Sequence, residues 1–158
     1  MIGKLIYCSV ELEGRVASLY QELASLAEGR EQFASLLLKQ IGLESMVHSE
    51  VFRSLGVSLG LYEETGECQT LIGGVWTRVE EALSKIKQQG KSDVRGVLKE
   101  LVSLEGFVGE ETYHRLLLPL LEKVLRDRDS LRLAKLVLEK IIQDEGFHEK
   151  AVNSILKY

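Results

Sequence analysis

Apolar residues recur every three or four positions along four long segments of the chain, which is the spacing that places them on one face of an α-helix. This pattern predicts long helices over residues 6–27, 31–55, 94–118 and 131–156. A shorter amphipathic pattern over residues 75–89 follows a glycine-containing, loop-like stretch from residue 56 to residue 74. The chain holds one proline and few alternating β-branched runs, so we expect an all-α fold.

The ends of the predicted helices carry local signals. Ser92 or Asp93 is suited to cap the third long helix, because such side chains accept hydrogen bonds from free backbone N–H groups. Asp129 or Ser130 is suited to cap the fourth in the same way. Pro119 is expected to kink or end the third helix, since proline has no N–H to donate. Short turns make two antiparallel hairpins of the four long helices, and the middle segment becomes a long crossover between them.

Each long helix carries polar residues within its otherwise apolar stripe. They are Glu13 in the first helix, His48 in the second, Glu105 in the third, and Glu145 with His148 in the fourth. Glu13 and Ser45 lie equally far from Gly29 on the two sides of the first turn, so they fall at the same height of the hairpin. The same counting puts Glu105 level with the pair in the fourth helix. Buried polar residues would not share a layer by chance, and the sequence therefore predicts a polar layer in the core.

A glutamate and a histidine three residues apart, such as Glu145 and His148, lie side by side on a helix. A buried carboxylate without a partner is costly, and a metal ion bound by these side chains would offset that cost. The alternative is a core histidine that hydrogen-bonds a glutamate. For the fourth helix alone this alternative is the simpler interpretation, and the inward polar residues of the other three helices favour the metal ion.

Three of the inward glutamates are followed directly by glycine, in the pairs Glu13-Gly14, Glu105-Gly106 and Glu145-Gly146. A glycine inside a helix costs about 1 kcal/mol relative to alanine. Two interpretations remain open: the glycines allow close helix packing, or they leave room for the carboxylates to move.

With these residues, the four long helices resemble the ferritin-like superfamily, and within it the rubrerythrin-like proteins. The segment Glu145-Gly-Phe-His148-Glu-Lys looks like the last metal-binding helix of rubrerythrins. The segment that begins at His48 resembles their second helix after its ligand histidine. Glu13 with Tyr20 resembles the first helix, and Glu105 with Tyr113 resembles the third.

The resemblance implies a ferritin-like four-helix bundle that holds a di-iron or di-manganese site, with zinc also compatible. Carried over position by position, the ligands would be Glu13, His48, Glu105, Glu145 and His148. The implied activity is that of an oxidoreductase acting on oxygen or peroxide. No rubredoxin-like segment is found in the sequence, so another protein would have to donate electrons. The resemblance also implies a homodimer.

Two positions depart from the family pattern. Ser45 stands where a glutamate is expected, and Val108 stands where rubrerythrins have an additional carboxylate in the third helix. Three glutamates leave two divalent ions with one uncompensated positive charge. Three arrangements remain open: Glu44 reaches in from the neighbouring position, an oxide or hydroxide from solvent completes a dinuclear site, or the site holds one ion or none.

Composition narrows the choice of partners. The 158 residues include 45% hydrophobic and 28% charged residues, the balance of one globular domain that spans residues 1–158. The net charge of −4 gives no indication of a nucleic acid or an anionic membrane as partner. No apolar run is long enough to cross a bilayer, and the N-terminus does not read as a signal peptide.

The two cysteines, Cys8 and Cys68, form no Cys-x-x-Cys pair, which excludes a rubredoxin-type or zinc-ribbon site built within this chain. Reduced thiols in a cytoplasmic protein are the default expectation, with a disulfide left open.

Two functions from different classes follow from these observations. The first is a metal-binding ferritin-like protein, acting on oxygen or peroxide if it is an enzyme. The second, motivated by Ser45 and Val108, is a metal-free helical bundle that acts as a binding or assembly module. The metal content of the purified protein separates the two.

Overall fold

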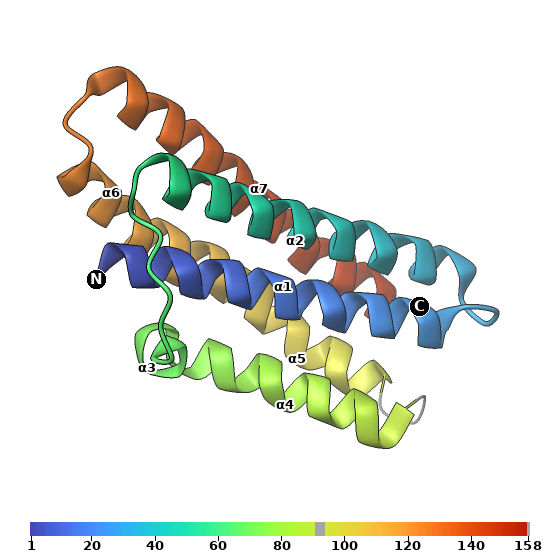
Figure 1. Cartoon of the computed structure of the whole chain (residues 1–158). Coiled ribbons are helices and arrows are strands. Elements are labelled where there is room, and N and C mark those ends of the chain that lie inside the picture. The colour runs from blue at the N-terminus through green and yellow to red at the C-terminus, as the bar shows by residue number, and fades with distance from the viewer. Residues whose placement is uncertain (91–93, 158) are drawn as a thin grey trace.

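The computed structural model describes residues 1–90 and 94–157, and over these residues the chain is helical without a strand (Figure 1). The prediction of an all-α fold is confirmed. The long helices are α1 (Ile2–Ala27), α2 (Gln32–Ser58), α5 (Val94–Phe107) and α7 (Arg128–Leu156). The other elements are α3 (Cys68–Ile72) and α4 (Gly74–Gln89) in the crossover, and the π-helix η2 (Val108–Leu117) followed by α6 (Leu118–Val124).

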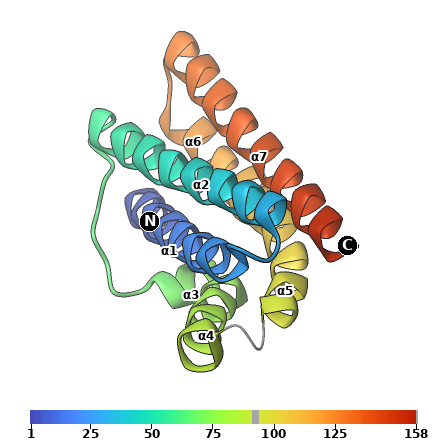
Figure 2. The same cartoon turned by 90° about the vertical axis from the view of Figure 1, so that its right-hand side faces the viewer.

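The long helices form two antiparallel hairpins. α1 and α2 make the first hairpin, and α7 folds back along α5 and η2 to make the second (Figure 1). α2 and α7 lie side by side, while α4 packs against α1 and α5 on another side of the molecule (Figure 2). Among the described residues, no helix combines the length and the apolar character that a membrane span requires.

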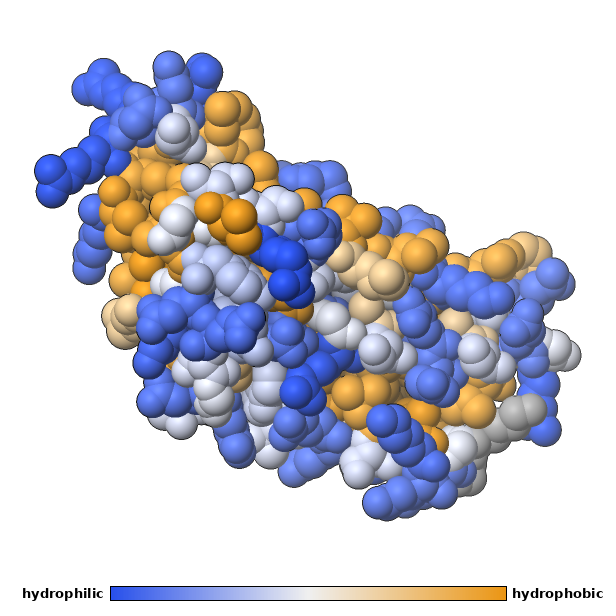
Figure 3. Space-filling view, in the orientation of Figure 1, coloured by the Kyte–Doolittle hydropathy of each residue, from blue (hydrophilic) through white to orange (hydrophobic). Residues whose placement is uncertain are grey.

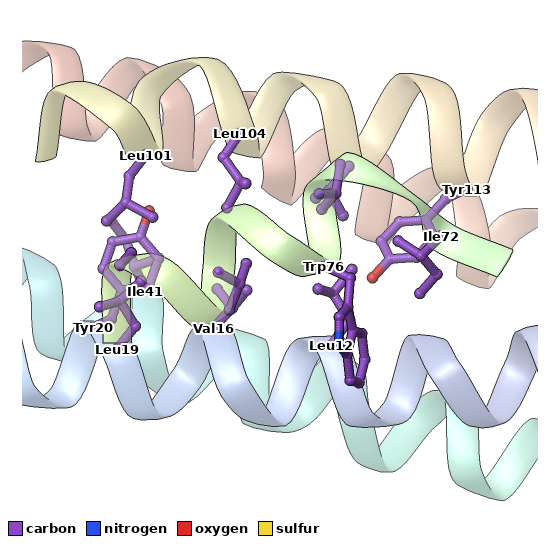
Figure 4. Packing of buried hydrophobic residues seen from close by; sticks show 14 of the residues in the cluster. Leu12, Val16, Leu19, Tyr20, Ile41, Ile72, Trp76, Leu101, Leu104 and Tyr113 are labelled. Atoms are coloured by element: carbon purple, nitrogen blue, oxygen red, sulfur yellow. The ribbon is translucent and has the colours of Figure 1, made fainter. Parts of the chain in front are cut away.

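Apolar side chains of the two hairpins meet in one core. Leu12, Val16 and Leu19 of α1 pack in a cluster with Leu101 and Leu104 of α5, and side chains of α3 and α4 close the cluster from the crossover (Figure 4). Full burial of an aliphatic side chain of this size contributes about 1.5–3 kcal/mol. The apolar stripes predicted from the sequence thus face one another.

Three helices extend beyond their predicted bounds. α1 starts at Ile2 rather than at residue 6, α2 runs on to Ser58, and α7 starts at Arg128 rather than at residue 131. Helix ends are set by a few local contacts, and apolar periodicity locates them only to within a turn.

The cap of α7 differs from the predicted one. Its N-cap is Asp127, whose carboxylate accepts a hydrogen bond from the backbone N–H of Ser130 at 2.7 Å. The prediction of Asp129 or Ser130 as this cap is therefore wrong, because both already lie inside the first turn. The predicted cap of α5, Ser92 or Asp93, lies outside the described residues.

The third long helix does not end at Pro119. α5 continues directly into η2, the π-helix, and η2 into α6, which has Pro119 in its first turn. Proline is tolerated in the first turn of a helix, because its missing N–H is not needed there. The π-helix ends just before Pro119, and the chain continues through the predicted break as α6.

Cys8 and Cys68 form a disulfide that joins α1 to α3, so the default expectation of reduced thiols is wrong. The two Cα atoms are 5.2 Å apart, although 60 residues separate the cysteines in the sequence. The connection from α2 to α3 passes close to α1, since a Cβ atom on Gly3 would overlap the carbonyl oxygen of Leu61. This close passage brings Cys68 to Cys8, which sequence spacing does not reveal.

Candidate metal centre

Five polar residues lie in the core between the two hairpins. Glu13 comes from α1, His48 from α2, Glu105 from α5, and Glu145 with His148 from α7. Each of the five is at most 2% exposed. Ionisable groups are rarely buried this deeply unless they are paired or bind a metal ion, so their partners decide what the cluster can do.

The five residues form two groups of three that share Glu145. Ligand atoms of Glu13, His48 and Glu145 lie within 4.8 Å of one another, and those of the second group, Glu105, Glu145 and His148, do the same. Oε1 of the shared residue is 3.1 Å from Nδ1 of His48 and 3.7 Å from Nδ1 of His148. Glu145 thus lies between two imidazoles, where a carboxylate that bridges two ions would lie.

Each histidine also faces a glutamate of its own. Nδ1 of His48 is 3.6 Å from Oε2 of Glu13, and Nδ1 of His148 is 3.6 Å from Oε2 of Glu105. The two halves of the cluster therefore have the same composition, one glutamate and one histidine each, arranged around the shared carboxylate.

Four buried ligand atoms have no hydrogen-bond partner among the residues that the structure describes: Nδ1 of His48, Nδ1 of His148, Oε1 of Glu105 and Oε1 of Glu145. The approach of His48 to Glu145 is short enough for a hydrogen bond but lacks the required angles. Each unsatisfied buried polar atom costs about 1–3 kcal/mol. A cation satisfies such atoms together, so the residues fit a metal ion both by type and by position.

The outer nitrogen of each histidine meets a carboxylate from the other hairpin. Nε2 of His48 on α2 lies 3.1 Å from Oδ2 of Asp144 on α7, and Nε2 of His148 on α7 lies 2.7 Å from Oε2 of Glu44 on α2. In a neutral imidazole whose Nε2–H is donated to a carboxylate, Nδ1 carries no proton and is available to a metal. Glu44 therefore supports a histidine and does not join either group of ligand atoms.

A tyrosine from the other hairpin lies beside each of the two unshared glutamates. Tyr113 on η2 donates its hydroxyl hydrogen to Oε1 of Glu13 on α1. Burial, followed by the nearby charge of Glu105, raises the pKa of Tyr20 well above its usual value. The Tyr20 hydroxyl forms no hydrogen bond with any described residue. Of the two glutamates, Glu13 is thus the one that a described tyrosine fixes by a hydrogen bond.

The buried charges change the protonation of the cluster. Burial raises the pKa of Glu145 well above its usual value, and the charges of Glu13 and Glu105 add to the shift. Burial opposes the charged form of His48, but its contacts with Glu13 and Asp144 together outweigh that effect and raise its pKa. Burial likewise opposes the charged form of His148, and its contacts with Glu105 and Glu44 together raise its pKa. The metal-free cluster therefore favours bound protons, which a metal ion must displace.

Ser45 and Val108 are both buried, and neither supplies a carboxylate. Ser45 is fully buried, and within residues 1–90 and 94–157 its Oγ finds no hydrogen-bond partner. Val108 is also buried and offers no ligand atom. Glu44, one of the candidates for the missing ligand, contacts Nε2 of His148 instead. The two groups of ligand atoms therefore include three glutamates.

The glycines that follow the buried glutamates do not mark close helix contacts. A Cβ atom on Gly14 would meet nothing closer than 4.0 Å, and one on Gly146 would meet nothing within 4 Å. A Cβ atom on Gly106 would overlap only the flexible carboxylate of Glu149. The interpretation as close packing is therefore wrong for Gly14 and Gly146, where a side chain would meet no close neighbour.

The close contact lies at Gly109 in η2. A Cβ atom there would lie 3.0 Å from Cβ of Glu145 and 3.6 Å from the carbonyl oxygen of Ile142. Real Cβ atoms rarely approach so closely, so the glycine lets η2 pass directly beside the shared carboxylate.

Sequence reasoning missed two residues of the site, Asp144 and Gly109. Asp144 precedes His148 by one helical turn, as Glu44 precedes His48, and this shared spacing was the available signal. Gly109 carries no such signal, because its contact depends on how η2 approaches α7.

Comparison with known proteins identifies no relative: no family profile matches the chain, and neither a curated protein nor a solved structure matches it. Fold and site together define an all-helical protein whose buried glutamates and histidines are able to hold a metal ion.

Proposed function

We propose that this protein is a ferritin-like metal-binding protein that holds two divalent transition-metal ions in its core. The observation that carries the proposal is the position of Glu145 between two imidazoles, with unpartnered ligand atoms on both sides. Glu13 and His48 hold one ion, and Glu105 and His148 hold the other. Glu145 bridges the two.

The ligand types narrow the choice of ion. Carboxylate and imidazole ligands suit iron and manganese, with zinc also compatible. The bound ions supply redox chemistry, and we propose an oxidoreductase that acts on oxygen or peroxide and takes its electrons from another protein. The protein's own part is to hold the ions away from bulk water and to orient the histidines through Glu44 and Asp144.

A metal titration tests the proposal. Protein freed of metal by a chelator is titrated with Fe²⁺ or Mn²⁺ in the absence of oxygen, and bound metal is measured by elemental analysis after gel filtration. We expect about two equivalents per chain. Uptake of less than about a tenth of an equivalent of iron, manganese and zinc would contradict metal binding.

Ser45 favours a second candidate function, that of a metal-free bundle that acts as a binding or assembly module. The reason is that a serine stands where the family pattern has a carboxylate ligand. The double variant Glu145→Gln with His148→Leu separates the candidates. In a metal-free bundle the variant is as stable as the native chain or more so, because buried polar groups are removed. In a metal-binding protein, added Mn²⁺ raises the melting temperature of the native chain but not that of the variant.

The family resemblance also leads us to propose a homodimer. Exposed apolar side chains on α2 and α7, among them Leu43, Val47, Leu136 and Phe147, offer surface for such a contact. Hydrophobic residues gather in patches among hydrophilic ones on the face shown in Figure 3. Light scattering should give about twice the chain mass of 17.7 kDa, and the mass of a single chain would contradict the dimer.

A further inference from the structure

The hydroxyl of Ser45 differs from those of other helical serines. Ser18, Ser25 and Ser154 each donate to the backbone carbonyl four residues earlier, at 3.1, 3.1 and 2.9 Å. Ser45 makes no such bond, and its buried Oγ has no hydrogen-bond partner in the part of the chain that the structure describes. A buried hydroxyl in this state is unfavourable unless an acceptor meets it.

The place of Ser45 in the site follows from an approximate two-fold relation between the hairpins. Corresponding residues occupy matching positions in the pairs Glu13 with Glu105, Tyr20 with Tyr113, Glu44 with Asp144, and His48 with His148. Ser45 and Glu145 are related in the same way, since each lies three residues before the histidine of its helix. Ser45 therefore stands on the inward face of α2, at the position that corresponds to the shared carboxylate on α7.

Charge points to the kind of group that would meet this hydroxyl. Two divalent ions bring four positive charges, against three negative charges from Glu13, Glu105 and Glu145. Glu44 and Asp144 keep their charge when they accept hydrogen bonds from the histidines, but both lie at the partly exposed edge of the site, and Asp144 also pairs with Lys140. The three carboxylates that would bind the ions directly therefore leave one positive charge uncompensated within the buried layer, where such a charge is unfavourable. A single monoanion balances the charge of this inner set of ligands.

We propose that a small monocarboxylate of the size of formate binds in the metal centre beside Ser45 and accepts a hydrogen bond from its hydroxyl. This inference rests on the proposed function, because the ions provide the charge that holds the carboxylate. Compared with glutamate, serine has its hydroxyl oxygen in place of Cγ and lacks the carboxyl group. The missing heavy atoms are those of formate. Longer carboxylates must fit additional carbon atoms into a packed core and bind less well.

The test uses the full chain loaded with Co²⁺, whose visible absorption reports changes in coordination. Formate, acetate and propionate are added separately, and sodium chloride keeps the ionic strength constant. We expect a saturable spectral change with formate, and propionate weaker than formate by about tenfold or more. Ser45→Ala should weaken formate binding by about tenfold, because a hydrogen bond to a charged group is lost.

Two further variants serve as controls. Ser45→Glu supplies a carboxylate of its own and should not respond to formate. Ser35→Ala removes another buried hydroxyl from α2, one that donates to the backbone carbonyl of Ala24 at 2.8 Å, and should leave formate binding unchanged. If Ser45→Glu does not fold, the formate affinities of Ser45→Ala and Ser35→Ala are compared instead, and a loss confined to Ser45→Ala supports the inference.

The outcomes separate this inference from the proposed function. If Co²⁺ binds but formate causes no saturable change, solvent hydroxide balances the charge and the inference is overturned, while metal binding stands. Equal formate affinity in the native chain and in Ser45→Ala also overturns it. Failure to bind Co²⁺ overturns both proposals.

Discussion

Tyr113, in the π-helix η2, donates its hydroxyl hydrogen to Glu13 of α1, so the second hairpin holds a candidate ligand of the first. Tyr113 follows Glu105 by eight residues, whereas Tyr20 follows Glu13 by seven. Eight residues of an α-helix end about 80° away from the starting face. The wider turns of a π-helix absorb the extra residue and keep Tyr113 directed into the core.

Replacing Tyr113 by phenylalanine should destabilise the metal-free protein. We expect Tyr113→Phe to lower the free energy of unfolding by about 1.5–3 kcal/mol, because the buried carboxylate of Glu13 loses its donor. Tyr20→Phe is the matched control, since it removes a buried hydroxyl that has no hydrogen-bond partner. Urea unfolding measures both variants, and equal losses would show that the Tyr113 bond has no special weight.

The outer carboxylates should control metal affinity without being ligands. We expect Asp144→Ala and Glu44→Ala each to weaken metal binding by about 10–100-fold, because His48 and His148 lose the groups that orient them. Glu139→Ala, at an exposed position of α7, should leave the affinity unchanged. Competition with a chelator measures the three affinities. If Asp144→Ala and Glu44→Ala both bind the metal as tightly as the native chain, these carboxylates do not orient the histidines for metal binding.

Two glycines near the shared carboxylate should respond oppositely to alanine. In Gly109→Ala the new Cβ atom presses on Glu145, so α7 must shift, and we expect a loss of about 1–3 kcal/mol together with weaker metal binding. In Gly146→Ala the new atom meets nothing, so the higher helix propensity of alanine should stabilise the protein by about 0.5–1 kcal/mol. Thermal unfolding measures both, and a stabilised Gly109→Ala would rule out the close approach of η2 to α7.

The metal-free protein should lose stability as the pH rises from about 5.5 to about 8. The carboxylate partners of His48 and His148 outweigh burial and raise their pKa. The two histidines therefore contribute fully to the stability of the folded protein below the usual imidazole pKa of 6.5. This contribution is lost as the pH rises through their raised pKa. Burial raises the pKa of Glu145, so the contribution of its protonated form to stability is also lost as the pH rises. The pKa values of Glu105 and Asp144 are lowered, so the titration of these two groups changes the stability only at more acidic pH.

Bound metal should reverse this trend, because it replaces the protons and binds more tightly as the ligands lose them. Urea midpoints at about pH 5.5 and about pH 8, with and without Mn²⁺, measure both trends. A metal-free protein that becomes more stable across this range would contradict the assigned protonation of the cluster.

The disulfide between Cys8 and Cys68 should contribute strongly to stability. It closes a loop of 60 residues, and the loss of chain entropy in the unfolded state predicts about 4 kcal/mol. We expect Cys8→Ala with Cys68→Ala to lower the free energy of unfolding by about this amount. The native chain unfolded in the presence of a reducing agent provides the comparison. Equal stability of the native chain with and without reductant would contradict the prediction.

The helices and the inward direction of their polar residues could be predicted from the sequence. A helix repeats every 3.6 residues whatever it packs against, so the stripe that contains Glu13, or the one that contains Glu145 and His148, is a local property. Counting from the turns also placed the polar residues of each hairpin at one level. This counting did not reveal that Asp144 contacts His48, although the spacing of Asp144 from His148 was visible in the sequence.

The sequence by itself determined where the long helices lie, which of their faces are apolar and which polar side chains turn inward, because backbone geometry and hydrophobic burial act over a few neighbouring residues. The tertiary structure decided which of these side chains meet: Glu145 between two histidines, Glu44 on His148, Tyr113 on Glu13, and Cys8 joined to Cys68. Such contacts depend on how separate helices cross and on where η2 widens the third helix. Packing of the whole chain sets both, and no short stretch of sequence specifies them.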